Sequence, residues 1–269
     1  MTRRHLTFLC EGDRLTGTID EASNTTGLLL VSGGNEIRSG AFSGQAALAA
    51  SLAEQGFPVF RFDRRGVGDS EGVNRGFREE EADIRAALAA FRGAAPHVSR
   101  IVGFGNCDAA SALMLAGGAG CSALVLSNPW TIEEAGDASN GGDDAGADTT
   151  PPASAIRARY IAKLKNPREI ARLLSGGVDY RKLLRGIARA VGPKPAPSTL
   201  AGDLRDGLGG FSGPVRILLA EADRTAQVFI ENWDASDTRI ARCPNAGHAY
   251  VEPHARQWLE ARLLEALHD

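Results

Sequence analysis

Three side chains in this sequence are of the types that carry out acyl transfer, and they occur in the chain order nucleophile, acid, histidine. Cys107 lies in the segment 105–109, Gly-Asn-Cys-Asp-Ala, at the position that serine occupies in a Gly-x-Ser-x-Gly turn. Asp223 follows an apolar run at 215–220, and His248 follows another at 238–243. A thiol, an imidazole and a carboxylate together can attack a carbonyl carbon and form a covalent intermediate. The sequence therefore predicts acyl transfer through a thioester on Cys107.

The chemistry of each group assigns its role. A free thiol has a pKa of about 8.5 and is mostly protonated at neutral pH, so Cys107 needs a base or a positive environment. His248 would take the proton, and the N-terminus of the following helix would stabilise the thiolate. Asp223 would orient the imidazole and stabilise its protonated form. Glu221 remains an alternative acid, because strand alternation directs only one of these two carboxylates to the site.

The oxyanion of the intermediate needs backbone N–H donors close to Cys107. One is expected to be the N–H of Asp108, the residue after the nucleophile, and the second comes from the segment 32–35, where Gly34 and Asn35 are the candidates. Glycine there lets the main chain approach a ligand closely. The side chain of Asp108 is open to two interpretations, a favourable charge at the helix N-terminus or a group that faces the substrate.

Short apolar runs alternate with helical patterns around these residues. The runs that predict strands are 6–10, 15–19, 27–32, 58–63, 100–104, 123–128, 215–220 and 238–243. The helical patterns cover 42–55, 78–91, 108–116, 226–234 and 254–267. The first two strands predict an antiparallel hairpin, and the later ones are apolar throughout, as in a parallel sheet covered on both faces. The predicted fold class is α/β, a mostly parallel central sheet with helices on both faces.

Residues 130–200 interrupt this alternation. The stretch 134–150 is acidic and rich in glycine and lacks large apolar side chains, so a mobile loop is expected there. Three basic amphipathic patterns follow at 155–164, 167–174 and 180–190. We expect a helical cap inserted over the C-terminal edge of the sheet, where ligands of open α/β sheets bind. The core is then formed by residues 1–129 and 201–269.

Composition excludes several other classes. The 269 residues carry a net charge of −3, so no general attraction to nucleic acid is expected. The four scattered cysteines, Cys10, Cys107, Cys121 and Cys243, favour neither a disulfide framework nor a metal site. No signal peptide and no membrane span is expected, which favours the cytoplasm. No metal and no cofactor is expected, and the oligomeric state stays open.

Several segments resemble a known family. The segment 63–70, Asp-Arg-Arg-Gly-Val-Gly-Asp-Ser, resembles a loop common in α/β-hydrolases of the serine-aminopeptidase-like branch. We interpret this segment as a structural turn that supports the turn at Cys107. The segments 33–40, 107–111, 128–130 and 173–180 resemble the type 1 hydrolases associated with the exosortase A system. This resemblance implies an α/β-hydrolase fold with a Cys-His-Asp triad. Arg38 and Trp130 lie in these segments and are expected to contact the substrate.

The function predicted from these features is hydrolysis of an ester or thioester through a Cys107 acyl-enzyme. The substrate would be an acyl group on a small molecule or on a carrier. Two alternatives remain: an acyltransferase that passes the acyl group from a thioester donor to an acceptor other than water, and a hydrolase-fold protein that binds a ligand without catalysis.

Overall fold

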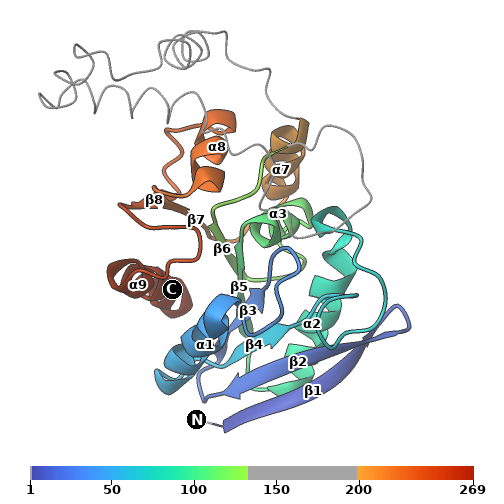
Figure 1. Cartoon of the computed structure of the whole chain (residues 1–269). Helices are drawn as coiled ribbons and strands as arrows, with labels where there is room; N and C mark the ends of the chain where they lie inside the picture. The colour runs from blue at the N-terminus through green and yellow to red at the C-terminus, as the bar shows by residue number, and fades with distance from the viewer. Residues whose placement is uncertain (1, 133–198) are drawn as a thin grey trace, which may run out of the picture. The chain divides into compact units, whose positions relative to one another are not determined.

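One sheet organises the part of the chain that the computed structural model describes, residues 2–132 and 199–269 (Figure 1). Its strands are β1 (Thr2–Cys10), β2 (Asp13–Glu21), β3 (Thr26–Val31), β4 (Val59–Phe62), β5 (Arg100–Asn106), β6 (Ala123–Ser127), β7 (Val215–Ala220) and β8 (Ile240–Cys243). They lie side by side in the order β1-β2-β4-β3-β5-β6-β7-β8. The last six strands in this order, β4-β3-β5-β6-β7-β8, are parallel, so their C-terminal ends meet at one edge of the sheet.

The predicted N-terminal hairpin is confirmed. β1 and β2 pair along their whole length from Thr2 opposite Glu21 to Cys10 opposite Asp13, and β2 joins the sheet antiparallel to β4. β1 begins four residues earlier than predicted. Its first residues are polar and exposed, so their hydropathy shows no strand, but cross-strand pairing with β2 extends the ladder.

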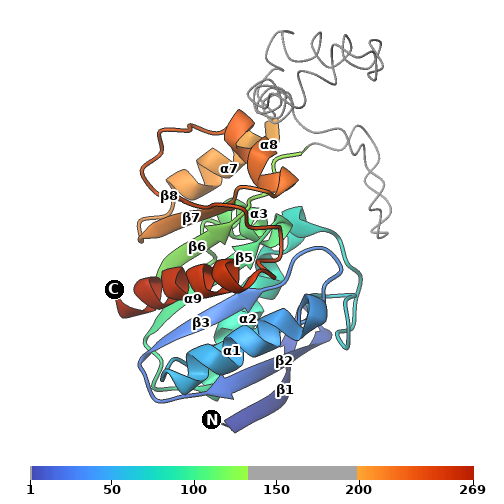
Figure 2. The ribbon, with the colours of Figure 1, turned by 60° about the vertical axis from the view of Figure 1, so that its left-hand side comes forward.

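Helices cover both faces of the sheet. They are α1 (Gly44–Glu54), α2 (Glu81–Ala94), α3 (Asp108–Leu115), α7 (Thr199–Gly209), α8 (Arg224–Asn232) and α9 (Pro253–His268), with short 3₁₀ turns at Ala41–Ser43 and Phe77–Glu79. α1 and α9 pack on one face, where Leu52 and Leu263 belong to one apolar core with Leu30 (Figure 2). α2, α3, α7 and α8 contribute to the core of the opposite face, in which the rings of Phe60 and Phe91 stack at 5.6 Å. The predicted architecture is confirmed.

The helix α7 was not predicted. Its Leu200, Leu204 and Leu208 recur every fourth residue and are all buried, which is the pattern of a helix with one apolar face. The predicted boundary between the cap and the core, at residue 200, falls within this helix, so its leucines were not recognised as one helical pattern. α7 packs against α3, the helix that follows Cys107.

The predicted cap, including the loop 134–150 and its three helical patterns, lies outside the described residues apart from its two ends. The chain divides into two compact units, Met1–Asp143 with Ser198–Asp269 and Asp144–Pro197, and the sheet belongs to the first. Among the helices that the structure describes, none is long and apolar enough to cross a membrane.

Candidate active site

Cys107 lies in a sharp turn between β5 and α3. Its backbone has φ 62° and ψ −129°, a region that costs a residue with a side chain roughly 1–3 kcal/mol. At Gly105 a Cβ atom would lie 2.6 Å from the backbone carbon of Ala109, so only glycine fits there. Ala109, which replaces the last glycine of the usual motif, is itself fully buried in the core. The turn therefore keeps the shape of a nucleophile elbow with a cysteine at its tip.

Asp223 and His248 lie beyond the C-terminal ends of β7 and β8, at the same edge of the sheet. The Oδ2 atom of Asp223 lies 3.0 Å from Nδ1 of His248. The same oxygen accepts a hydrogen bond of 3.3 Å from the N–H of Ala226, so Asp223 also caps α8. Asp223 is buried, whereas Glu221 is exposed. The structure thus places Asp223 against the imidazole.

The imidazole of His248 contacts the carboxylate of Asp223 and the thiol of Cys107. The hydrogen bond with Asp223 is the largest cause that raises the pKa of His248 to about 10, and the hydrogen bond with Cys107 acts in the same direction. Burial opposes both effects. The side chain is 43% exposed, so solvent screens part of the attraction. The balance of these effects favours the protonated form of His248 at neutral pH.

Two asparagines hold the backbone of His248 in place. Nδ2 of Asn106 donates to the carbonyl oxygen of His248 at 3.2 Å, and Nδ2 of Asn128 approaches the same oxygen at 3.4 Å. Asn128 also donates to Oδ1 of Asn106 at 2.9 Å and accepts from the N–H of Ala220 at 2.8 Å. Neither asparagine was predicted as a site residue. The available signal was their position, Asn106 directly before Cys107 and Asn128 at the end of the apolar run 123–128.

The expected oxyanion donors differ in the hydrogen bonds that they already make within the protein. The N–H of Asp108 begins α3, as expected for the residue after the nucleophile. The N–H of Gly34 is already bonded to the side chain of Asp108, at 2.8 Å from Oδ1 and 2.9 Å from Oδ2. Asn35 is exposed, and its side chain accepts a hydrogen bond of 3.0 Å from Asn74. The Asp108 side chain thus lies where the second donor was expected to meet a ligand.

A further carboxyl group, Glu36, lies in the same loop as Gly34. Burial raises its pKa, and the charge of Asp108 acts in the same direction, whereas hydrogen bonding to Ala41 and the charge of His248 lower it. Its Oε1 accepts from the N–H of Ala41 at 2.5 Å and its Oε2 from the side chain of Gln45 at 2.6 Å. Glu36 thus couples electrostatically to the catalytic histidine candidate while holding the start of α1.

The residues expected to contact the substrate lie in different surroundings. The side chain of Arg38 bonds Asp63 and lies 3.0 Å from Asp69 and 3.1 Å from the hydroxyl of Thr18. These contacts hold its guanidinium against the loop 63–70, and a contact of Arg38 with substrate stays a prediction. Trp130 lies beside the elbow, because its N–H donates to the carbonyl of Cys107 at 3.3 Å. Trp130 therefore stays a candidate for substrate contact.

The loop 63–70 follows β4 and approaches the turn at Cys107 through Arg64. Asp63 is fully buried and accepts from the N–H groups of Arg38 and Asp69 at 2.6 and 3.1 Å, which fixes the turn. Arg64 is buried as well, donates to Glu80 at 2.8 Å and lies 3.8 Å from Oδ2 of Asp108. This geometry agrees with a supporting role for the loop.

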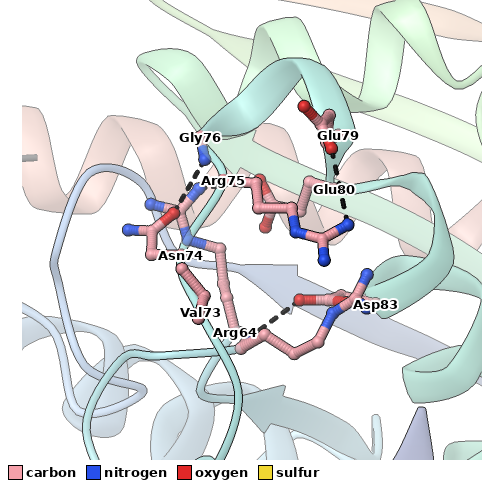
Figure 3. A pocket seen from close by; sticks show the side chains of 9 residues that line it. Arg64, Val73, Asn74, Arg75, Gly76, Glu79, Glu80 and Asp83 are labelled. Atoms are coloured by element: carbon pink, nitrogen blue, oxygen red, sulfur yellow. Dashed lines mark hydrogen bonds and ion pairs between the residues drawn. The ribbon is translucent and has the colours of Figure 1, made fainter. Parts of the chain in front are cut away.

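A small polar cavity lies behind this contact, between the loop and the beginning of α2 (Figure 3). Arg64, Asn74, Glu80 and Asp83 are among its lining residues, and its free volume is about 10 Å³. That volume holds a single water molecule at most, so the cavity is too small for an acyl substrate. Burial raises the pKa of Glu80, although the guanidinium of Arg64 acts in the opposite direction.

Solved structures resemble the chain over nearly its full length. The esterase Pf2001 of Pyrococcus furiosus is 16% identical with a TM-score of 0.60, over 99% of this chain and 90% of that one. The α/β hydrolase GrgF from Penicillium sp. sh18 is 17% identical with a TM-score of 0.62, over 99% and 98% of the two chains. Est1E from Butyrivibrio proteoclasticus, solved with ferulic acid, is 16% identical with a TM-score of 0.60, over 98% and 100%.

At these identities the likeness concerns the fold. A search of the curated proteins found no match. The family model described as the alpha/beta hydrolase family matches residues 28–262, which include most of β3, all of β4 to β8 and the positions of Cys107, Asp223 and His248. This chain belongs to the alpha/beta hydrolase family.

Proposed function

We propose that this protein is a hydrolase that cleaves an ester or thioester with Cys107 as its nucleophile. The observation that carries the proposal is the position of one imidazole between two partners. His248 contacts the thiol of Cys107, and its Nδ1 lies 3.0 Å from Asp223. A protonated imidazole beside a cysteine sulfur is the arrangement of a thiolate–imidazolium pair. The strained turn presents that sulfur at the C-terminal edge of the sheet.

In the first step the thiolate sulfur of Cys107 attacks the carbonyl carbon of the substrate. A C–S bond forms, and the electron pair of the C=O bond moves to oxygen, where the N–H of Asp108 stabilises it. The intermediate then collapses and expels the alcohol or thiol part of the substrate, which takes the proton from His248. The products of this step are an acyl thioester on Cys107 and a neutral His248.

In the second step water attacks the thioester carbon, and His248 takes a proton from that water. The C–S bond breaks when the second tetrahedral intermediate collapses. Cys107 leaves as a thiolate beside the protonated His248, so the starting charges are restored. Asp223 stabilises the imidazolium and keeps Nδ1 in its orientation throughout the cycle.

The chemistry of the nucleophile favours a thioester or another activated acyl donor, on a small molecule or on a carrier. Thiolates exchange readily with thioesters, whereas serine is the commoner nucleophile for plain esters. The resemblance of the segments around Cys107 and Asn128 to the exosortase A-associated hydrolases supports the triad, and it does not select the acyl donor. Transfer to an acceptor other than water uses the same acyl-enzyme and differs only in the second nucleophile.

A second candidate function is binding of an acyl ligand without turnover. The observation that favours it is the hydrogen bond of Gly34 to the carboxylate of Asp108, at 2.8 and 2.9 Å, because it occupies an expected oxyanion donor. A catalyst must free this donor or work with the N–H of Asp108 alone.

Turnover measurements distinguish these functions. We expect the protein to hydrolyse a short acyl thioester with a higher kcat/KM than the oxygen ester of the same acyl group. An added primary amine that captures the acyl group in competition with water would identify transfer. Binding of the thioester without release of its thiol would support the non-catalytic function and contradict the proposal.

A further inference from the structure

The side chain of Asp108 reaches across the elbow to the loop after β3. Both of its oxygens accept from the N–H of Gly34, at 2.8 and 2.9 Å. Room for the carboxylate depends on the residue before Gly34, because a Cβ at Gly33 would lie 2.4 Å from Oδ1 of Asp108. The loop is thus shaped to receive this side chain, in a place where a side chain at position 33 would exclude it.

This contact conflicts with the chemistry expected at the same place. In a hydrolase of this fold the second oxyanion donor comes from the loop after β3, and that donor bonds the oxygen of the tetrahedral intermediate. The carboxylate of Asp108 is itself an anion with two acceptor oxygens. The N–H of Gly34 therefore stabilises either Asp108 or the substrate oxyanion, and two negative groups at one donor repel each other.

A second partner for the carboxylate lies within reach. Nη2 of Arg64 is 3.8 Å from Oδ2 of Asp108, longer than a hydrogen bond but close enough for electrostatic attraction. The guanidinium cannot easily follow Asp108, because Arg64 is buried and donates to Glu80 at 2.8 Å beside the cavity of Figure 3. A small rotation of the Asp108 side chain toward Arg64 would free Gly34.

We propose that the Asp108 carboxylate is a displaceable occupant of the oxyanion hole, which moves from Gly34 to Arg64 when the substrate oxyanion forms. This inference rests on the proposed function, because it concerns the acylation of Cys107. In the resting protein Asp108 satisfies the Gly34 donor. During acylation its displacement opposes the reaction, so the side chain lowers the rate for every acyl donor that needs the second N–H.

The test compares Asp108→Ala and Asp108→Asn with the wild type in single-turnover acylation by p-nitrophenyl acetate. We expect Asp108→Ala to acylate roughly tenfold faster, a part of the effect of one oxyanion donor. Asp108→Asn should gain less, because its amide oxygen can still accept from Gly34 without the charge. Asp206→Ala, which removes an exposed carboxylate from α7, should acylate at the wild-type rate.

A second measurement reads the resting contact without catalysis. Hydrogen exchange of the Gly34 amide, followed by NMR, should be slower in the wild type than in Asp108→Ala. Equal exchange, or wild-type acylation rates in a folded Asp108→Ala, would overturn the displaceable-occupant inference while leaving Cys107 as nucleophile. Failure of all four proteins to acquire an acetyl group on Cys107 would overturn the proposed function and this inference with it.

Discussion

The two sides of Cys107 carry opposite charge. On one side, hydrogen bonds to Asp223 and Cys107 raise the pKa of His248 to about 10, which favours a positive charge on the imidazole beside the sulfur. On the other side, the Asp108 carboxylate covers the N–H of Gly34, and Glu36 adds a second carboxyl group in the same loop. We refer to these as the histidine side and the oxyanion side.

This difference separates the two requirements of covalent catalysis. The histidine side, His248 with Asp223, holds the imidazole on its carboxylate before any substrate arrives. The oxyanion side, Gly34 with Asp108, is satisfied within the protein and must be rearranged for the transition state. Proton transfer by His248 and stabilisation of the oxyanion thus depend on different residues, so variants on the two sides should change the rate in opposite directions.

The largest effect is expected for the nucleophile that both sides share. Cys107→Ala should lower turnover by roughly 10⁴-fold or more, because it removes the sulfur on which the proposed acyl-enzyme forms. Steady-state hydrolysis of a thioester measures this loss. Cys121→Ala is the matched control: burial raises the pKa of the Cys121 thiol to about 12, so that sulfur is inert and activity should be unchanged. Equal activity of Cys107→Ala and wild type would show that Cys107 is not the nucleophile.

The next effect concerns the histidine side alone. His248→Ala should lower kcat by roughly 10³-fold, and Asp223→Asn by somewhat less, because the imidazole then loses its orienting carboxylate. Glu221→Gln removes an exposed carboxylate two residues away and serves as the control in the same kinetic assay. If Glu221→Gln lowered kcat and Asp223→Asn did not, the assignment of Asp223 as the acid of the triad would be wrong.

A smaller effect is expected for the two asparagines, Asn106 and Asn128, that bond the backbone carbonyl of His248. Asn106→Ala removes the donor that lies 3.2 Å from the His248 carbonyl and also the acceptor of Asn128. We expect roughly a tenfold loss of kcat with little change in KM, since the imidazole is then less well positioned. Asn232→Ala, which removes a similar side-chain bond at the end of α8, should leave kcat unaltered. Loss of stability alone, with normal kcat, would argue against a positioning role.

The smallest effect is a dependence of stability on pH. The pKa of His248 is raised in the folded protein, so its bond to Asp223 contributes fully below the unfolded pKa near 6.5 and is lost as pH rises through about 10. The wild type should exceed Asp223→Asn in free energy of unfolding by roughly 1 kcal/mol or less near pH 6, because the imidazole is exposed. Urea unfolding between pH 6 and about 10 should show this difference shrink. A difference that grew with pH would contradict the assigned charge.

Much of the fold follows from local patterns in the sequence. The parallel strands are short apolar runs, and Asp223 and His248 could be placed because each directly follows one. The limits of the prediction were elements whose partners are distant. β1 was predicted too short because its polar start is stabilised by pairing with β2, and α7 was missed because its leucines cross the expected cap boundary.

The candidate site shows the same limit at the level of side chains. Cys107 and its glycine are local features of one turn, so the sequence identifies them. The bond between the Arg38 side chain and Asp63 joins residues 25 positions apart, so the sequence around Arg38 does not reveal it. The contacts of Asp108 with Gly34 and of Asn106 with His248 span 74 and 142 residues, and no motif announces them. Such pairs depend on how loops meet at the edge of the sheet.

If Cys107 carries the acyl group, intact-mass spectrometry should detect that group on its sulfur. Wild type, His248→Ala and Cys107→Ala are incubated with an activated ester, whose leaving group needs no proton, and the modified residue is located by peptide mapping. We predict that His248→Ala accumulates one acyl group on Cys107, because deacylation needs the base, and that Cys107→Ala acquires none. Stable acylation of another residue, or turnover by Cys107→Ala at the wild-type rate, would contradict the account.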